Sequence, residues 1–206
     1  MTDTNKQTSA KYFDNISSEY DNDRIPEPIR CYPLLWKKIS KDAKSIVDLG
    51  CGTGSMLQLI AENTSDDVKL VGVDLSEGMI NEASKKANDR MSFMVGDVEN
   101  LPFEDNSFDA VLCMHSFHHY PNPEQAISEM FRICAAGGSV YIVENYKKGI
   151  ARYIANLVII LWYRRRKGDM KVYSVDEIES LMKGDNATSV TSELLTERSF
   201  LVQGLK

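Results

Sequence analysis

The sequence predicts an α/β protein built on a mostly parallel sheet with helices on both faces. Three observations support this class. Short apolar runs, typical of buried strands, recur through the middle of the chain, and segments with helical spacing separate them. A third observation is that residues favoured at helix ends stand at the boundaries of these segments. Strands that alternate with helices form right-handed βαβ units, and such units build a parallel sheet.

The expected strands and helices follow one another in a regular order. Strands are expected at residues 45–50, 68–75, 91–97, 108–114 and 139–145. The first helix is expected over 53–62. The second starts after Ser76, a suitable N-cap, and runs to about residue 88. The third follows Asn122 and a proline, with Gln125 placed to close a capping box, and Gly137-Gly138 lies beyond its end at residue 134.

The two ends of the chain lie outside this alternation. Residues 1–40 have helical spacing and are expected to form a helical lid. Ser174 and Glu177 form a capping box for a helix to Lys183, and two late strands are expected near 188–194 and 199–203. An apolar stretch with a basic end occupies residues 150–167, within a region, 146–173, that we expect to be an insertion on the substrate side.

Composition excludes several classes of protein. The 206 residues suit one domain, and a net charge of −6 argues against a nucleic-acid partner. None of the four cysteines is spaced as C-x-x-C, so neither a zinc ribbon nor a redox pair is indicated. The first ten residues are polar and resemble no signal peptide, so we expect a cytoplasmic protein with reduced thiols.

A glycine-rich turn follows the first expected strand. Gly50, Gly52 and Gly54 permit positive φ angles and let a ligand approach the backbone, beside the free N–H groups of the next helix. The spacing is G-x-G-x-G, whereas a dinucleotide-binding loop has G-x-G-x-x-G. An NAD-dependent oxidoreductase is therefore disfavoured, although a tight turn without a ligand would show the same glycines.

Acidic residues stand at the ends of the next two strands. Asp74 follows the glycine turn at a distance that lets its carboxylate accept the two hydroxyls of a ribose. Asp97 and the backbone N–H of Val98 could contact the edge of an adenine. Since the carboxyl ends of parallel strands meet at one edge of the sheet, these groups predict a nucleoside site there.

With these motifs the chain resembles the class I S-adenosylmethionine-dependent methyltransferases, especially the group that methylates quinones on carbon. The matching stretches are VDLGCGTG (47–54), GVDLSEGMI (72–80), GDVENLPFEDNSFDAVLCMHSFHH (96–119) and PEQAISEMFRICAAGGSVYIVE (123–144). The resemblance implies a Rossmann-like three-layer sandwich whose seven-stranded sheet has an antiparallel last strand. One departure, Ala135-Ala136 before the paired glycines where the family more often has Lys-Pro, affects only a structural turn.

The resemblance also implies roles in cofactor binding. Gly50 and Gly52 would lie beside the methionine part of S-adenosylmethionine, Asp74 at the ribose, and Asp97 and Val98 at the adenine. The full set of expected cofactor residues is Tyr20, Asp48, Gly50, Cys51, Gly52, Gly54, Asp74, Leu75, Met79, Asp97, Val98, Cys113 and Met114.

All three histidines lie in one stretch, MHSFHHY (114–120), directly after the fourth strand. This position would place them beside the methyl group to be transferred. His115 and His119 are the candidate general bases, because imidazole titrates near neutral pH, although a packing or cofactor-contact role is also open. No metal is expected, because the adjacent His118 and His119 should point apart and no acidic cluster lies next to them in the sequence.

The expected reaction is methyl transfer to a small molecule through an oxygen, nitrogen or carbon atom. An apolar acceptor such as a quinone or lipid is one candidate. The alternative is a module that binds S-adenosylmethionine without transferring its methyl group. The stretch 150–167 is too short to cross a bilayer, and either packs over the sheet or makes peripheral contact with a membrane. The sequence leaves the acceptor and the oligomeric state open.

Overall fold

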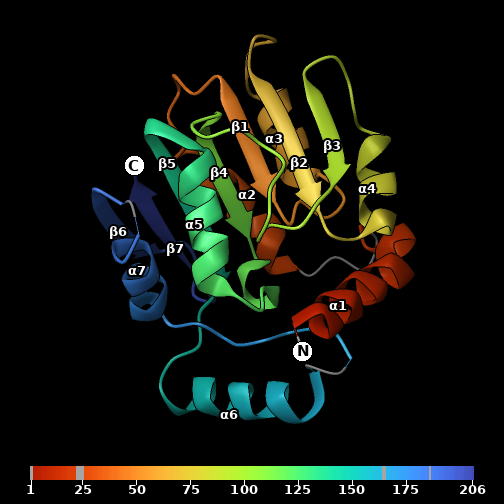
Figure 1. Cartoon of the computed structure of the whole chain (residues 1–206), viewed down its shortest axis with the longest axis vertical. Coiled ribbons are helices and arrows are strands. Elements are labelled where there is room, and N and C mark those ends of the chain that lie inside the picture. The colour runs from red at the N-terminus through yellow and green to blue at the C-terminus, as the bar shows by residue number, and fades with distance from the viewer. Residues whose placement is uncertain (1, 22–25, 164–165, 186) are drawn as a thin grey trace.

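The computed structural model of the chain describes residues 2–21, 26–163, 166–185 and 187–206. At its centre is a seven-stranded sheet with the strand order β3-β2-β1-β4-β5-β7-β6 (Figure 1). The strands are β1 (Ser45–Leu49), β2 (Lys69–Asp74), β3 (Met91–Val95), β4 (Phe108–Met114), β5 (Cys134–Asn145), β6 (Ser189–Leu194) and β7 (Ser199–Leu205).

The direction of the strands confirms the expected topology. Strands β1 to β5 pair in parallel, and the last strand, β7, is antiparallel to both β5 and β6. β1 lies between β2 and β4, so the order of the strands reverses at this point. In open α/β sheets, ligands bind outside the carboxyl ends of the strands at such a reversal.

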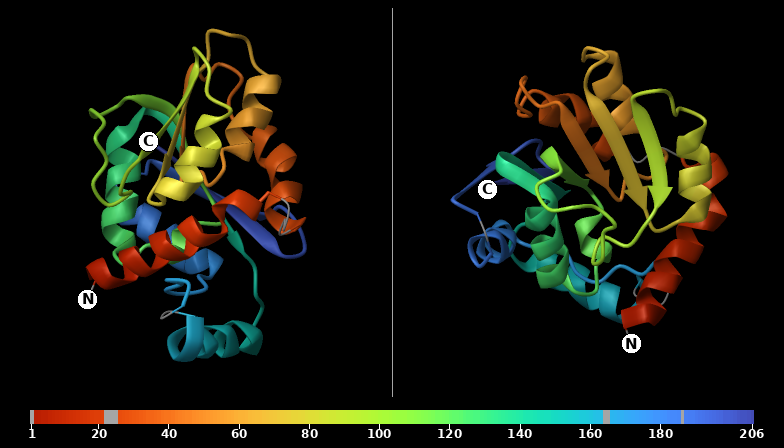
Figure 2. Two further views of the ribbon diagram at one scale, coloured as in Figure 1. Left: turned by 90° about the vertical axis from the view of Figure 1, so that its right-hand side faces the viewer. Right: turned by 45° about the horizontal axis from the view of Figure 1, so that its top comes forward.

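Helices cover both faces of the sheet (Figure 2). They are α1 (Thr2–Ile16), α2 (Pro26–Trp36), α3 (Ser55–Glu62), α4 (Glu77–Ser84), α5 (Pro123–Ile133), α6 (Ile150–Val158) and α7 (Val175–Lys183). Residues of α5 and α7 pack with one set of strand side chains, and residues of α2 and α3 pack with another. Burial of these two apolar clusters drives the formation of the three layers.

Two of the three expected helix caps are present. Ser76 accepts from the backbone N–H of Met79 at the start of α4, and Ser174 and Glu177 form the capping box of α7. The capping box at Asn122 was wrong, since its side chain makes no cap hydrogen bond. Its amide instead donates to the Glu99 carboxylate, 2.6 Å away, so tertiary contact replaces the local cap.

Two expected boundaries also differ. β5 begins at Cys134 rather than at Ser139, because Gly137 adopts a φ of 79° within the strand and allows pairing to continue past it. β3 ends at Val95 rather than at Asp97, which places Asp97 in the loop that follows.

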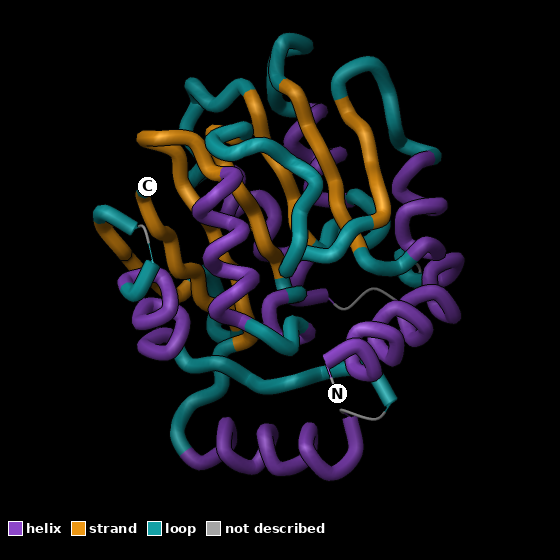
Figure 3. Tube along the Cα trace, in the orientation of Figure 1, coloured by secondary structure: helices purple, strands orange, loops and turns teal. Residues whose placement is uncertain are grey.

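Helix α6 does not pack over the sheet, so that expectation was wrong. It stands apart from the body at the edge where the strands end, and residues after 165 return as a loop between α6 and the body (Figures 1 and 3). All residues of α6 are described, and none is buried. Of the basic cluster that follows, Arg164 and Arg165 lie outside the described residues. Within the described ranges, no helix is long and apolar enough to cross a membrane.

Candidate cofactor and active site

A cavity of about 910 Å³, open to solvent, lies at the carboxyl ends of β1 to β4. Its walls come from the four loops that follow these strands and from α1 and α2. The site is therefore where the strand order predicts it.

The glycine turn forms one wall. The N–H groups of Gly50 and Cys51 donate to the carbonyl of Val73, at 2.8 and 3.0 Å, which fastens the turn to β2. Gly50 has a φ of 73°, and a Cβ atom there would lie 2.4 Å from the Cβ of Ser116. Only glycine fits both constraints, so the first glycine is required by the contact between two loops.

Asp74 lies at the centre of the site. Its two oxygens accept from the backbone N–H groups of Gly52 and Ser76, each at 2.9 Å. Burial raises the pKa of Asp74 above its usual value, although these backbone hydrogen bonds oppose the shift. A carboxylate oxygen can accept more than one hydrogen bond, so Asp74 keeps capacity for the hydroxyls of a ligand.

Asp48 is buried beside Asp74. Its Oδ1 atom has no hydrogen-bond partner in the part of the chain that the structure describes. Burial, and then the charge of Asp74, raise the pKa of Asp48 to about 7. A buried carboxyl group without a partner is costly, and a cation bound nearby would favour its ionised form.

Lys6 closes the side of the cavity near β3. Its ammonium group lies 2.7 Å from Oδ2 of Asp97 and 2.5 Å from Oε2 of Glu99. Glu99 is buried, and its other oxygen accepts from the N–H of Asn122. Lys6 therefore fastens α1 to the loop after β3.

A second contact fastens α1 to the start of α4. Oδ1 of Asp14 accepts from the hydroxyl of Ser76 at 2.6 Å and from the N–H of Gly78 at 2.9 Å. As a result α1 lies across the edge of the sheet toward which the strand arrows point (Figure 1). This position suits the proposed lid.

His115 occupies an unusual backbone conformation. Its φ is 51°, in the left-handed region that non-glycine residues seldom adopt, and its N–H donates to the carbonyl of Val143 at 2.8 Å. The side chain lines the cavity, and Nε2 has no partner among the described residues. Burial lowers the pKa of His115, which favours the neutral ring near pH 7.

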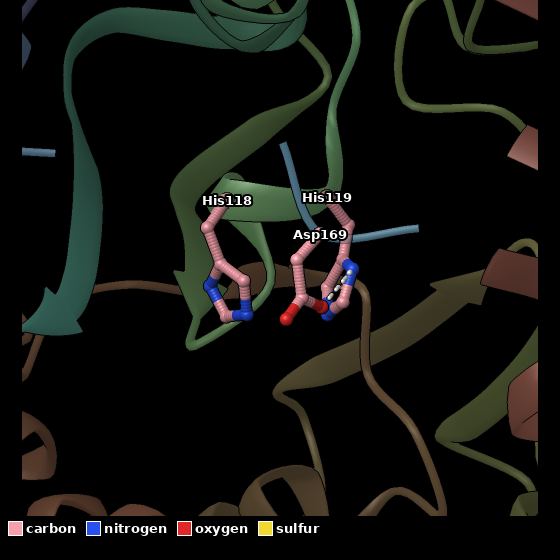
Figure 4. A group of neighbouring side chains, drawn as sticks. All are labelled: His118, His119 and Asp169. Atoms are coloured by element: carbon pink, nitrogen blue, oxygen red, sulfur yellow. Dashed lines mark ion pairs between the residues drawn. The ribbon is translucent and has the colours of Figure 1, made fainter. Parts of the chain in front are cut away.

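His118 and His119 do not point apart, so that expectation was wrong. Both side chains turn toward Asp169, a residue of the loop after α6, and the ring centroids lie 4.2 Å apart (Figure 4). Nδ1 of His119 is 3.4 Å from Oδ1 of Asp169. The 146–173 segment folds back toward the body and brings this carboxylate to the histidines. Asp169 is distant from them in the sequence, so the sequence did not indicate this contact.

Glu144 holds His118 from the opposite side. Its oxygens lie 2.9 and 3.0 Å from Nδ1 of His118. Burial alone would lower the pKa of His118, but the charge and hydrogen bond of Glu144 outweigh this and raise it. Burial and the neighbouring His118 hold the pKa of His119 well below its usual value.

The ligand atoms of His118, His119 and Asp169 lie within 4.8 Å of one another, so this group could hold a metal ion. The pairs His118–Glu144 and His119–Asp169 would account for the same arrangement without a metal ion. That no metal binds here stays a prediction, although the reasons given for it from the sequence do not hold.

Most of the expected site residues line the cavity. They are Tyr20, Gly50, Cys51, Gly52, Asp74, Leu75, Met79, Asp97, Val98, Met114, His115 and His119. Three do not: Asp48 is buried beside Asp74, Gly54 faces Phe93, and the thiol of Cys113 lies 3.1 Å from the hydroxyl of Ser116 in the core. Direct contact of these three with a cofactor stays a prediction.

Other lining residues were missed. They include Lys6, Ser9, Phe13, Tyr32, Ser116 and Tyr120. Lys6, Ser9 and Phe13 follow the spacing of one helix face, and this was the only available signal for them. Ser116 and Tyr120 directly follow the candidate bases His115 and His119, and their hydroxyls are 2.9 Å apart.

A comparison with known protein families agrees with the geometry of the site. Residues 47–142 match the family described as "Methyltransferase domain". With the sheet order, the glycine turn and the acidic strand ends, this match and the relatives below show that the chain belongs to the class I S-adenosylmethionine-dependent methyltransferases, whose cofactor is S-adenosylmethionine.

Two of the proteins that this chain resembles are demethylmenaquinone methyltransferases. The chain is 30% identical, over 177 residues, to demethylmenaquinone methyltransferase of Lactococcus lactis, and the match covers 78% of this chain and 70% of the relative. The Staphylococcus aureus enzyme of the same name is 29% identical over 148 residues, which cover 68% of this chain and 61% of that enzyme.

Solved structures share the fold. A complex between the Trm112 methyltransferase activator of Haloferax volcanii and a putative methyltransferase matches with a TM-score of 0.80 and 21% identity, covering 96% of each chain. At this identity the likeness shows the fold alone.

Proposed function

We propose that this protein transfers a methyl group from S-adenosylmethionine to an apolar small molecule, a quinol being the best-supported class. The observation that carries the proposal is the cavity in which acidic strand ends and a neutral imidazole face one space. The demethylmenaquinone methyltransferases among its relatives supply the choice of quinol.

The residues of the cavity fit this cofactor. The unpartnered carboxyl oxygen of Asp48 and the adjacent Asp74 form a buried acidic region that would favour a cation. Asp74 would hold the ribose, and Asp97 and Val98 would hold the adenine beneath Lys6. When bound, the cofactor supplies a methyl group on a positively charged sulfur, which leaves as a neutral thioether.

The lid residues would exclude water from the reacting groups. Phe13 and Tyr20 line the cavity, and the Phe13 ring meets His119 edge-on at a centroid distance of 5.2 Å. Orientation of two reactants in a closed site can contribute roughly 7–11 kcal/mol to catalysis. Placement and water exclusion are therefore the main contributions of this chain.

His115 would act as the base. Methylation of a quinol carbon, or of a neutral hydroxyl, releases one proton. His115 lines the cavity, its buried Nε2 atom has no partner among the described residues, and its lowered pKa favours the neutral ring. His119 is the second candidate, although Asp169 approaches its Nδ1 atom.

Labelled methyl transfer tests the proposal. Purified protein is incubated with methyl-labelled cofactor and a short-chain demethylmenaquinol, and the organic extract is analysed for labelled product. Product formation supports the proposal. Saturable cofactor binding without any product, from this quinol or from a cell extract, would favour the alternative of a binding module.

The variant His115→Asn tests the base. Asparagine tolerates a positive φ better than most residues, so the backbone should be preserved while the base is removed. We expect turnover to fall by at least about tenfold, a modest part of the effect usual for acid–base catalysis, with no change in cofactor affinity. The wild-type rate should rise with pH through a midpoint below about 6.5, the ordinary histidine value. Unchanged turnover in both His115→Asn and His119→Asn would exclude a histidine base.

A further inference from the structure

Helix α6 and the π-helical turn after it expose most of their large apolar side chains between residues 150 and 162, although Ile159 is buried. Tyr153 is 67% exposed, Leu157 is 56% exposed, and Trp162 is 61% exposed. The same surface continues over Ile150, Ile154, Val158, Ile160 and Leu161. We call this surface the apolar face of α6. A contiguous exposed surface of this kind marks an interaction site.

The polar side chains of α6 face the protein instead. Arg152 lies 3.1 Å from a carboxylate oxygen of Glu177, and the Asn156 side chain bonds both the N–H and the carbonyl of Val172, at 2.6 and 3.2 Å. This is the reverse of the arrangement in an ordinary surface helix, whose apolar side faces the core. The contacts of Arg152 and Asn156 therefore hold the helix with its apolar face outward.

Basic residues are concentrated in the sequence on either side of this face. Eight of the 24 lysines and arginines of the chain lie in residues 147–171, together with one of its 30 acidic residues. The remainder of this acidic chain is therefore strongly negative. The guanidinium of Arg166 lies 5.6 Å from the centre of the Trp162 ring, at the end of the apolar face.

We propose that the apolar face of α6 docks on an anionic lipid surface, with the helix lying in the plane of the interface. Tryptophan and tyrosine beside cationic side chains suit the boundary between acyl chains and headgroups. The charge of the segment complements anionic headgroups. An acidic protein could satisfy the charge, but an exposed apolar helix face with aromatic residues fits a lipid interface better.

The position of α6 connects this docking to the site. A second cavity lies between α6 and the body, lined by Ala155, Val158 and Ile159 on one side and by His118 and Asp169 on the other. The next residue, His119, lines the cofactor cavity. Resting on the function proposed above, this arrangement would let a lipid-dissolved acceptor enter from the bilayer beside the histidines.

Vesicle cosedimentation of the full chain tests the docking without any turnover. We expect the protein to pellet with phosphatidylcholine vesicles that contain about 30% phosphatidylglycerol at low salt, and less as salt rises. The double variant Ile154→Glu/Leu157→Glu should lower the vesicle affinity by at least about tenfold. Leu194→Glu, at a residue of similar exposure on β6, is the matched control and should not.

Folding is checked independently. S-adenosylhomocysteine affinity of the double variant should stay within about twofold of wild type. No pelleting of wild type at low salt, equal binding to pure phosphatidylcholine, or an equal loss in Leu194→Glu would overturn the proposal. The proposal would also be overturned if the protein did not bind vesicles and instead used the apolar face of α6 to self-associate or to bind an acidic protein. Vesicle binding by a protein without transferase activity would refute only the proposed function.

Discussion

The substitution Asp74→Asn tests the proposed ribose site most directly. In the structure, the two carboxylate oxygens of Asp74 accept from the N–H groups of Gly52 and Ser76, at 2.9 Å each. Asparagine keeps the size of the side chain but replaces one acceptor with an NH₂ donor. That donor would face a backbone N–H, and the remaining oxygen alone would serve the ligand.

The expected loss follows from the number of acceptors removed. A hydrogen bond to a charged group contributes about 1.5–3 kcal/mol, and loss of the carboxylate leaves at least one cofactor hydroxyl without its charged acceptor. Since about 1.4 kcal/mol corresponds to tenfold, the dissociation constant should rise between about 10-fold and about 150-fold. S-adenosylmethionine and S-adenosylhomocysteine should both be affected, because they share the ribose.

Calorimetric titration with both ligands provides the measurement. Asp67→Asn is the matched control, since Asp67 is an exposed carboxylate that holds Lys44 at 2.7 Å before β2, at the opposite edge of the sheet. Its affinity should equal that of wild type. A change below about threefold in Asp74→Asn would mean that the ribose lies elsewhere.

Two further substitutions test the buried acid and the lid. Asp48→Asn should stabilise the protein increasingly as pH rises from about 4 to about 7, by up to about 4 kcal/mol. The reason is that the pKa of Asp48 is raised to about 7 in the folded protein. The wild type therefore loses stability over this pH range, because Asp48 ionises in the unfolded chain but not in the folded one. Urea unfolding at several pH values measures this, and a difference independent of pH would contradict it. Asp14→Ala removes the acceptor of Ser76 and Gly78, so α1 should dock less firmly and the cofactor should dissociate faster. Stopped-flow dissociation measures the rate, and an unchanged rate would mean that α1 is no lid.

The parallel part of the fold could be predicted because its signals are local. Strands buried on both faces are short apolar runs, and caps such as Ser76 lie next to the helices they begin. The start of β5 at Cys134 could not be predicted. It depends on pairing with β4 on the far side of Gly137, and no local pattern in the sequence indicates that pairing. The orientation of α6 was also hidden, since periodicity reveals an apolar face but not whether the protein covers it.

The site divides in the same way. Residues at strand ends were predictable, because topology alone brings Asp74 and His115 to one edge. Lys6 and Asp169 were missed because their partners are distant in sequence. Lys6 pairs with Asp97, 91 residues further on, and Asp169 meets His119 only because the loop after α6 returns to the body.

The buried acids also explain why this site would favour a cation. Asp48 and Asp74 are both buried, each has a raised pKa, and the charge of Asp74 disfavours ionisation of Asp48. A positive sulfonium would relieve this repulsion, whereas the neutral thioether that remains after transfer would not. Asp48, which lowers the stability of the protein as pH rises above about 4, and Asp74 would therefore bind the substrate form of the cofactor more tightly than its product. The burial of Asp48 lowers stability, but it would also make the site bind the positive sulfonium more tightly than the neutral thioether. This difference would help the product to leave.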